Sequence, residues 1–305
     1  MLSDIQEEVE SQPDLLGAFA RKALPCLKSG SLLVGAGDSF IAAKCAELLS
    51  SFRCIAVDPY VLLSSPSLSR KRAVTFISVS GRTKSNIAAA EKVKGIACRT
   101  LCLTADSHSP LSEATEETLT IPYRYRPRVP GTLSFTLSLT AALKLSSSYK
   151  DCRFQSLFDR ARADASTFRF ADLGTTFFLG NHLAYAASLY AAAKTYEFFG
   201  GKAQAQLLEE FSHLELFSLQ QQDRVNIFSH ADPLEAGARL ERTLRVKGYS
   251  ATLVKSQGRN PVEQAFHAVF TAQLASIARM RDLGHRSPYF MKSGEKLGAS
   301  DSMIY

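Results

Sequence analysis

The run SVSGRT at residues 78–83 is the part of the sequence best suited to holding a phosphate. It follows the apolar residues 74–77 and precedes a helix that we expect to begin near Ser85. Backbone N–H groups at a helix N-terminus attract anions, the three hydroxyl groups add donors, and Gly81 lets the backbone approach a ligand. An ordinary helix cap with a turn glycine uses the same residue types, so both interpretations stay open. The GxxxxGK[ST] spacing of a P-loop is absent.

A second candidate for chemistry is Glu197, in the run KTYEFF at the end of a helix expected over residues 184–198. Among aromatic side chains, loss of solvent would raise the pKa of this carboxyl group and suit it to taking a proton from carbon. A glutamate that points into solvent at a helix end is the alternative. His213 follows sixteen residues later. The other histidines show no metal-ligand spacing and are expected in core or surface roles: His108, His182, His230, His267 and His285.

The run GAGDSF at residues 35–40 follows the first expected strand, and Asp58 ends the next one. This spacing requires that a dinucleotide-binding fold be considered. The third glycine of that fingerprint, which lets a helix pack closely on a strand, is replaced by Phe40. We therefore expect a tight turn that exposes Ser39 at the start of a helix.

The elements that must position these residues alternate between apolar runs and segments of helical period, which predicts an α/β fold with mostly parallel sheets. In the first half we expect strands at residues 32–35, 54–57, 74–79, 100–104 and 119–121, and helices at residues 40–50, 85–94 and 132–145.

The second half repeats this plan, with strands expected at residues 176–180, 225–229 and 251–254 and a long helix at residues 261–283. Gly35 and Ser78 are 43 residues apart, and Gly180 and Ser229 are 49 apart; we place the excess near residues 200–217. The sequence thus predicts two doubly wound, flavodoxin-like domains, 1–150 and 151–305, each with a sheet flanked by helices.

Composition places the chain among globular proteins, since 305 residues with 46% hydrophobic residues supply a sizeable core. The net charge of +7 is spread along the chain without a basic-aromatic patch, so we expect no nucleic-acid partner. The acidic first 13 residues and the polar interruptions of the apolar stretches argue against a signal peptide and a membrane span. Six cysteines without a CxxC pair fit a reduced, cytoplasmic protein without a metal site.

The arrangement strand–SVSGRT–helix, with GAGDS about forty residues upstream, resembles the sugar isomerase (SIS) domain. The tandem plan is similar to the isomerase portion of glucosamine-fructose-6-phosphate synthase, to archaeal amino-sugar-phosphate deaminases and to archaeal phosphoglucose/phosphomannose isomerases. Residues 4–13, DIQEEVESQP, are similar to the EI-x-EQP start of the synthase-like members.

This resemblance implies which residues bind the substrate. Ser78, Ser80 and Thr83 would hold the phosphate of a sugar, with Ser39 and Thr132 lining the same pocket.

The sequence departs from the synthase pattern at Val79 and Arg82, where the pattern has Gln and Glu, so the hydrogen bonds to the sugar hydroxyls are expected to differ. The second half carries SHAD at residues 229–232 in place of the serine loop. We therefore expect a phosphate site in the first domain alone.

The interval between Glu197 and His213 matches that of the catalytic glutamate and histidine in tandem SIS isomerases. The resemblance implies that Glu197 moves a proton between C1 and C2 through a cis-enediol. His213 would open the sugar ring, usually in the pocket of a neighbouring subunit, so a homodimer is expected. Lys194 matches a lysine of the synthase pattern, and Lys292 resembles a tail lysine that contacts the open-chain carbonyl or forms a Schiff base with it.

Leu-Glu follows His213, where the synthases and deaminases have Gly-Pro. The residues after His213 are thus closer to the pattern of the phosphoglucose/phosphomannose isomerases. Lys194, in contrast, matches the pattern of the synthases.

The sequence therefore predicts an aldose–ketose isomerase of a hexose 6-phosphate that needs no metal or cofactor. The expected partner is a phosphorylated sugar, not a membrane. A glucosamine-6-phosphate deaminase is a second enzymatic interpretation. A sugar-phosphate-binding regulator without turnover is the third, but no helix-turn-helix segment precedes Leu32 and both Glu197 and His213 are present.

Overall fold

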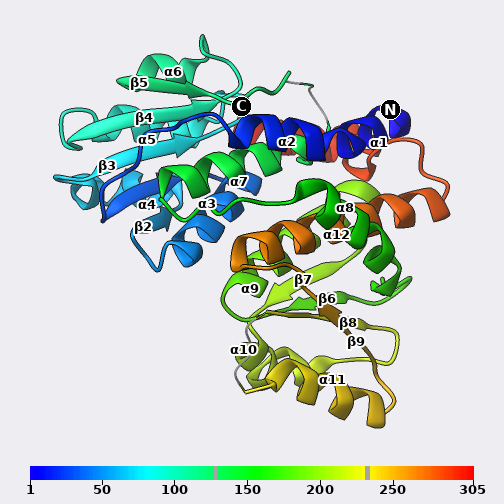
Figure 1. Cartoon of the computed structure of the whole chain (residues 1–305). Helices are drawn as coiled ribbons and strands as arrows, with labels where there is room; N and C mark the ends of the chain where they lie inside the picture. Colours follow the sequence, from blue (N-terminus) through cyan, green and yellow to red (C-terminus); the bar gives the residue numbers. More distant parts are fainter. Residues whose placement is uncertain (125, 127–128, 231–233) are drawn as a thin grey trace. The chain divides into compact units, whose positions relative to one another are not determined.

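The computed structural model describes residues 1–124, 126, 129–230 and 234–305, which divide into two compact units. The first unit consists of Asp14–Asp151 with Gly294–Tyr305, and the second of Met1–Pro13 with Cys152–Ser293. This division differs from the continuous segments 1–150 and 151–305 at the two ends of the chain, which belong to opposite units. Each unit contains one parallel sheet flanked by helices (Figure 1).

The sheet of the first unit has five parallel strands in the order β2-β1-β3-β4-β5. This order reverses between β1 and β3, and open α/β sheets bind their ligands at such a switch point, outside the carboxyl ends of the strands. The strands are β1 (Ser31–Val34), β2 (Cys54–Val57), β3 (Ala73–Ile77), β4 (Arg99–Thr104) and β5 (Glu117–Thr120).

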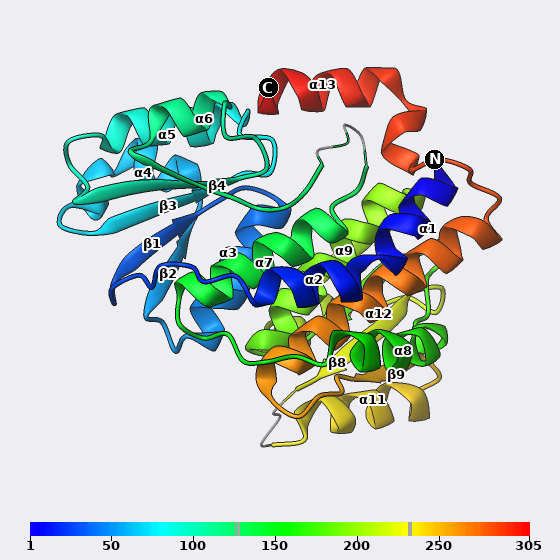
Figure 2. The same cartoon turned by 45° about the horizontal axis from the view of Figure 1, so that its top comes forward.

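Helices cover both faces of this sheet (Figure 2), which explains why β1, β3 and β4 are buried along almost their whole length. Leu62, Ala89, Val93 and Leu111 bring α4, α5 and α6 onto one face, whereas α3 and α7 pack together on the other. The helices of this unit are α2 (Gln12–Ala20), which begins at the unit boundary, α3 (Asp38–Leu49), α4 (Pro59–Ser64), α5 (Lys84–Val93), α6 (Pro110–Ala114), α7 (Leu133–Leu145) and α13 (Gly294–Ile304), with a 3-10 turn η1 (Pro66–Ser69).

The sheet of the second unit has four parallel strands in the order β7-β6-β8-β9. This is the order of β2-β1-β3-β4, so the expected fold class, two parallel sheets flanked by helices, is confirmed. No counterpart of β5 is present among the residues that the structure describes. The strands are β6 (Thr176–Leu179), β7 (Ala203–Gln206), β8 (Arg224–Ser229) and β9 (Ser250–Lys255).

The helices of the second unit also form two layers (Figure 1). α10 and α11 pack on one face of the sheet through Leu208, Phe211 and Leu244, and α9 covers the other face beneath α12 and α8. The helices are α1 (Leu2–Glu10), α8 (Phe154–Asp164), α9 (Leu183–Phe199), α10 (Leu208–His213), α11 (Ala236–Val246) and α12 (Pro261–Asp282), with 3-10 turns η2 (Ala165–Thr167), η3 (Glu215–Ser218) and η4 (Tyr289–Lys292).

The extra length of the second copy does not lie mainly at residues 200–217, as the sequence interpretation placed it. That segment forms β7, α10 and η3, the counterparts of β2, α4 and η1. Most of the excess lies in α9, which has 17 residues where α3 has 12. The longer helix carries the Lys194–Glu197 segment.

Glu263 fastens the start of α12 to the segments around it. Its carboxylate accepts the Arg259 N–H at 2.7 Å and the Arg153 N–H at 3.1 Å, and it pairs with the Arg259 guanidinium. These donors, led by the Arg259 side chain, hold the pKa of the Glu263 carboxyl at about 2, below the ordinary 4.5.

We expect Glu263→Gln to lower the free energy of unfolding at pH 7 by about 2 kcal/mol, because the ionised carboxylate is stabilised only in the folded state. That stabilisation is complete above pH 4.5 and is lost as the pH falls towards 2, so the deficit of the variant should shrink in that window. Urea unfolding at pH 7 and pH 3 measures it, with Glu241→Gln as the control. An equal deficit at both pH values would contradict this assignment.

Candidate functional site

The turn between β3 and α5 brings together the three hydroxyl groups predicted to hold a phosphate. The Ser78 and Thr83 hydroxyl oxygens lie 3.3 Å apart, and Ser78 Oγ accepts the Gly81 N–H at 3.2 Å. Ser80 Oγ accepts the Arg82 N–H at 3.3 Å. The first N–H groups of α5 have no acceptor within their own helix, so this turn offers both N–H and O–H donors to an anion.

Gly81 is required at this turn for two physical reasons. Its φ of 63° lies in the left-handed region, and a side chain there would collide with Ser109 at the start of α6. The loop therefore takes its shape from the glycine and from the serines that bind its own N–H groups.

Ser39 and Thr132 border the same sheet edge. Ser39 lies half-buried in the first turn of α3, which follows β1, the neighbour of β3 in the sheet. Thr132 is fully buried immediately before α7. A side chain at Gly131 would collide with the Asp38 carboxylate, so the start of α7 lies directly against the start of α3. The predicted phosphate ligands thus share one edge of the first unit.

Cationic side chains flank the serine loop. The Arg82 guanidinium lies 3.4 Å from the Asp106 carboxylate, and both side chains are exposed. Lys84, the first residue of α5, donates to the backbone carbonyl of Ser302 at 3.2 Å, which ties α13 to this helix. The loop therefore carries a positive charge that a single exposed ion pair only partly offsets.

In the second unit, Lys194 and Glu197 form an ion pair in the last turns of α9. Lys194 Nζ donates to Glu197 Oε2 at 2.6 Å; the lysine is fully buried and the glutamate side chain is 31% exposed. Glu197 was expected among apolar side chains, but in the structure its carboxylate lies beside the Lys194 ammonium group. The carboxylate of this pair is the form of the carboxyl group that accepts a proton.

The segment that carries Lys292 packs against the end of α9. A side chain at Gly200, which ends this helix in a left-handed conformation, would collide with the Tyr289 ring. Lys292 Nζ lies 5.5 Å from the centre of that ring. The structure thus brings η4, and with it Lys292, to the end of the helix that holds Lys194 and Glu197.

His285, expected in a core or surface role, lies beside Tyr289 and Lys292 in the same tail segment. Its ring stacks on Tyr289, with the centres 5.9 Å apart. Partial burial lowers the pKa of His285, and the Lys292 ammonium group lowers it further. No spacing in the sequence indicates this position, because the chain must first turn at Gly284 (φ 70°) to bring the ring to Tyr289.

His213, the last residue of α10, is 72% exposed, and its ring lies 3.9 Å from the exposed Glu209 carboxylate. Two large apolar side chains beside it are also exposed, Leu214 by 59% and Phe217 by 84%. The end of α10 thus presents an imidazole and two apolar side chains to solvent.

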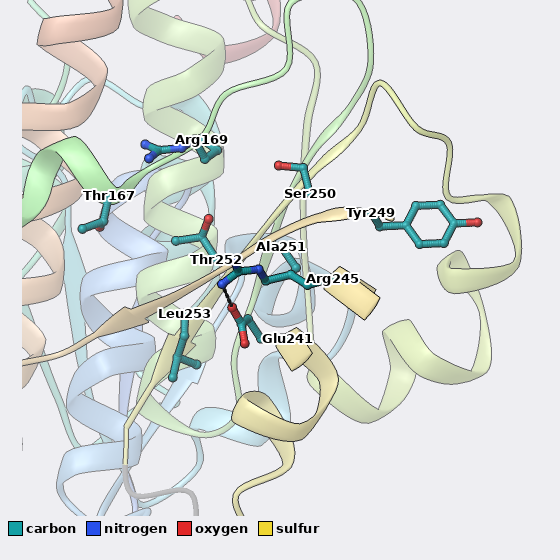
Figure 3. A pocket seen from close by; sticks show the side chains of 9 residues that line it. All are labelled: Thr167, Arg169, Glu241, Arg245, Tyr249, Ser250, Ala251, Thr252 and Leu253. Carbon is teal, nitrogen blue, oxygen red and sulfur yellow. Dashed lines mark hydrogen bonds and ion pairs between the residues drawn. The ribbon is translucent and has the colours of Figure 1, made fainter. Parts of the chain in front are cut away.

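A cavity of about 480 Å³ lies along β9 in the second unit (Figure 3), and none of the predicted site residues lines it. Its arginines already have partners: Arg245 pairs with Glu241 at 3.1 Å, and Arg169 donates to backbone carbonyls of Ser166 and Phe168. Both guanidinium groups are therefore engaged within the protein. It is lined by Thr167, Arg169, Glu241, Arg245, Tyr249, Ser250, Ala251, Thr252 and Leu253.

Of the loop at residues 229–232, positions 231 and 232 lie outside the described residues. Across the described part of the chain, no group of three or more His, Cys, Asp or Glu side chains is arranged to hold a metal ion. Within the same residues, no helix has the length and apolar character needed to cross a membrane.

The serine loop lies in a segment of the chain that matches a known protein family. Residues 32–146, which run from β1 to the end of α7, match the family model described as SIS domain. The match does not extend to the second unit, whose assignment as a second SIS domain stays a prediction. No curated protein matches the sequence.

Solved structures share the fold of almost the whole chain. Glucosamine-6-phosphate deaminase from Thermotoga maritima superposes with a TM-score of 0.74 at 20% identity, over 92% of this chain and 95% of that one. Tagatose-6-phosphate ketose/aldose isomerase from Escherichia coli gives 0.70 at 20% identity, over 92% and 94%. The C-terminal domain of glucosamine-fructose-6-phosphate aminotransferase from Francisella tularensis gives 0.68 at 15% identity, over 91% and 96%.

Proposed function

We propose that this protein is a phosphosugar isomerase, which interconverts the aldose and ketose forms of a hexose 6-phosphate. The observation that carries the proposal is the hydroxyl-lined turn at the start of α5, inside the segment that matches the SIS domain. Such a turn suits a phosphate group, since N–H and O–H donors converge at the positive end of a helix. The names of the three similar structures reported above, each an enzyme of a sugar 6-phosphate, support this substrate class.

In the proposed reaction, Ser78, Ser80 and Thr83 hold the phosphate, with Ser39 and Thr132 beside them. His213 assists ring opening. Glu197 then takes the proton from C2 of the open-chain aldose, and the electron pair passes to the carbonyl oxygen on C1 to form the enediol. The proton of the C2 hydroxyl group passes to the oxygen on C1, and return of the proton from Glu197 to C1 then gives the ketose, with its carbonyl at C2.

Two lysines assist this proton transfer in our proposal. Lys194 keeps Glu197 ionised, as their 2.6 Å contact favours, and Lys292 stabilises the charge on the substrate oxygen. The step itself balances with a carboxylate base and cationic side chains, so the proposal includes no cofactor.

A panel of hexose and hexosamine 6-phosphates tests the reaction type, with ketose and ammonia measured in the same samples. Isomerisation predicts ketose from glucose or mannose 6-phosphate without ammonia. Ammonia from glucosamine 6-phosphate, with no ketose from the neutral sugars, would mean that the protein is a deaminase that uses the same base and not an isomerase. Binding without any product would leave a sugar-phosphate-binding protein.

We also propose a homodimer in which the surface of Leu214 and Phe217 contacts a second copy and His213 serves the neighbouring subunit. Replacing Phe217 by Asp should weaken the dimer at least about tenfold, because burying such a side chain is worth roughly 1.5–3 kcal/mol. Sedimentation at several concentrations measures this, with Val246→Asp on the exposed side of α11 as the matched control. A wild-type monomer that turns over substrate would refute the proposal.

A further inference from the structure

A line of buried polar side chains in the second unit connects the start of α2 with α12 and α9. Gln12 Nε2 donates to Gln273 Oε1 at 2.7 Å, and Gln273 Nε2 donates to the Tyr190 hydroxyl at 2.8 Å. All three side chains are completely buried. Gln12 Nε2 is also 3.3 Å from the Val9 carbonyl oxygen, which fixes the amide to the end of α1.

This line continues along one face of α9 to the candidate base. Lys194 Nζ lies 4.9 Å from the centre of the Tyr190 ring, four residues earlier, and 2.6 Å from Glu197 Oε2, three residues later. Spacings of three and four residues place side chains next to one another on a helix. The tyrosine ring and the carboxylate therefore hold the ammonium group between them.

The position of the ammonium group depends on the tyrosine ring. A buried lysine is stable only where its charge is compensated, and here the ring face and the carboxylate both attract it. The ring cannot change its tilt without breaking the hydrogen bond from Gln273, whose amide is held by Gln12 in turn. Moving any of these three side chains would therefore move Lys194 and the carboxylate of Glu197.

We propose that Gln12, Gln273 and Tyr190 are positioning residues that fix the Lys194–Glu197 pair for proton transfer, an inference that rests on the proposed function of that pair. Gln12 belongs to the run SQP at residues 11–13, and no residue of this run takes part in the proposed reaction. The positioning role gives Gln12 a function. The three residues touch no reacting atom and act through the orientation of Lys194.

The first test is Tyr190→Phe, which keeps the ring and its attraction for Lys194 but removes the hydroxyl group that Gln273 fixes. We expect kcat to fall about tenfold or more with KM within about twofold, since small misplacements of a catalytic group are costly. Tyr185→Phe, near the other end of α9, is the matched control. Equal losses from both variants, or a loss that follows the melting temperature alone, would overturn the proposal.

A double-mutant cycle tests whether the residues act as one line. Gln273→Leu and Tyr190→Phe should each lower kcat, and the double variant should be no slower than the slower single variant, because both break the same connection. Additive losses would mean that the two side chains act separately and would contradict the inference.

A measurement without substrate separates this inference from the proposed function. Amine-reactive labelling followed by mass spectrometry gives the rate at Lys194, with the exposed Lys202 as the internal control. We expect Tyr190→Phe and Gln273→Leu to speed labelling at Lys194 several-fold and to leave Lys202 unchanged. An unchanged rate at Lys194 would overturn the positioning role whatever the activity. Faster labelling in a protein that isomerises no sugar would instead reject the proposed function.

Discussion

Glu197→Gln is expected to lower the turnover of a hexose 6-phosphate at least about a hundredfold with KM nearly unchanged, which is the loss typical of a general base. Glutamine keeps the size of the side chain and can still accept a hydrogen bond from Lys194, but its amide cannot take a proton from C2. The loss should therefore appear in kcat and not in substrate affinity.

Glu210→Gln is the control for this variant, because Glu210 is an exposed carboxylate on α10, near the candidate histidine in sequence. Its turnover should stay near that of the wild type. If Glu210→Gln stops the reaction and Glu197→Gln does not, the base lies on α10 and the role given to the Lys194–Glu197 pair is wrong.

The second large effect is expected at the serine loop. Ser80→Ala should weaken binding of a phosphosugar by about 1–3 kcal/mol, because one hydrogen bond to a charged oxygen is lost. The Ser80 hydroxyl also accepts the Arg82 N–H, so the variant loosens the turn that orients the other donors. Calorimetry with a hexose 6-phosphate measures the change.

Ser229→Ala is the matched control, since Ser229 ends β8 as the equivalent position of the second sheet and is expected to bind no phosphate. Unchanged affinity in Ser80→Ala would contradict the assignment of the loop. A loss of affinity in Ser229→Ala would show that the second sheet takes part in binding.

The strands inside the two sheets could be predicted because covered parallel strands are short apolar runs bounded by polar turns. β8 was expected at residues 225–229 and runs over Arg224–Ser229. β7 was missed because its sequence, AQAQ, carries no β-branched or aromatic residue and lies at the half-buried edge of the second sheet.

The serine loop could be predicted because its geometry is local. Its hydroxyl groups and glycine are within six residues of one another, and the hydrogen bonds that shape it join neighbours. The Lys194–Glu197 pair is also local, at a spacing of three residues on one helix. The burial of Lys194 could not be predicted, because α9 is covered by α12, which begins more than sixty residues later in the sequence.

The line from Gln12 to Tyr190 was beyond sequence reasoning for the same reason. Gln12 and Gln273 are 261 residues apart, and Gln273 and Tyr190 are 83 apart. Nothing in the spacing of a single sequence joins such residues, and each alone is an ordinary polar position in a helix. His285 likewise acquires neighbours only when the tail packs on the end of α9.

Incubation of the wild-type protein with glucose 6-phosphate in D₂O shows whether a carboxylate of this protein transfers the proton through an enediol. Proton transfer through an enediol by a carboxylate that exchanges with solvent predicts fructose 6-phosphate, together with deuterium at C2 of the recovered aldose; Glu197→Gln should abolish both. Isomerisation without any deuterium uptake would weaken the case for an exchanging base. Exchange in Glu197→Gln at the wild-type rate would contradict the account, because the proton would then be taken by another group.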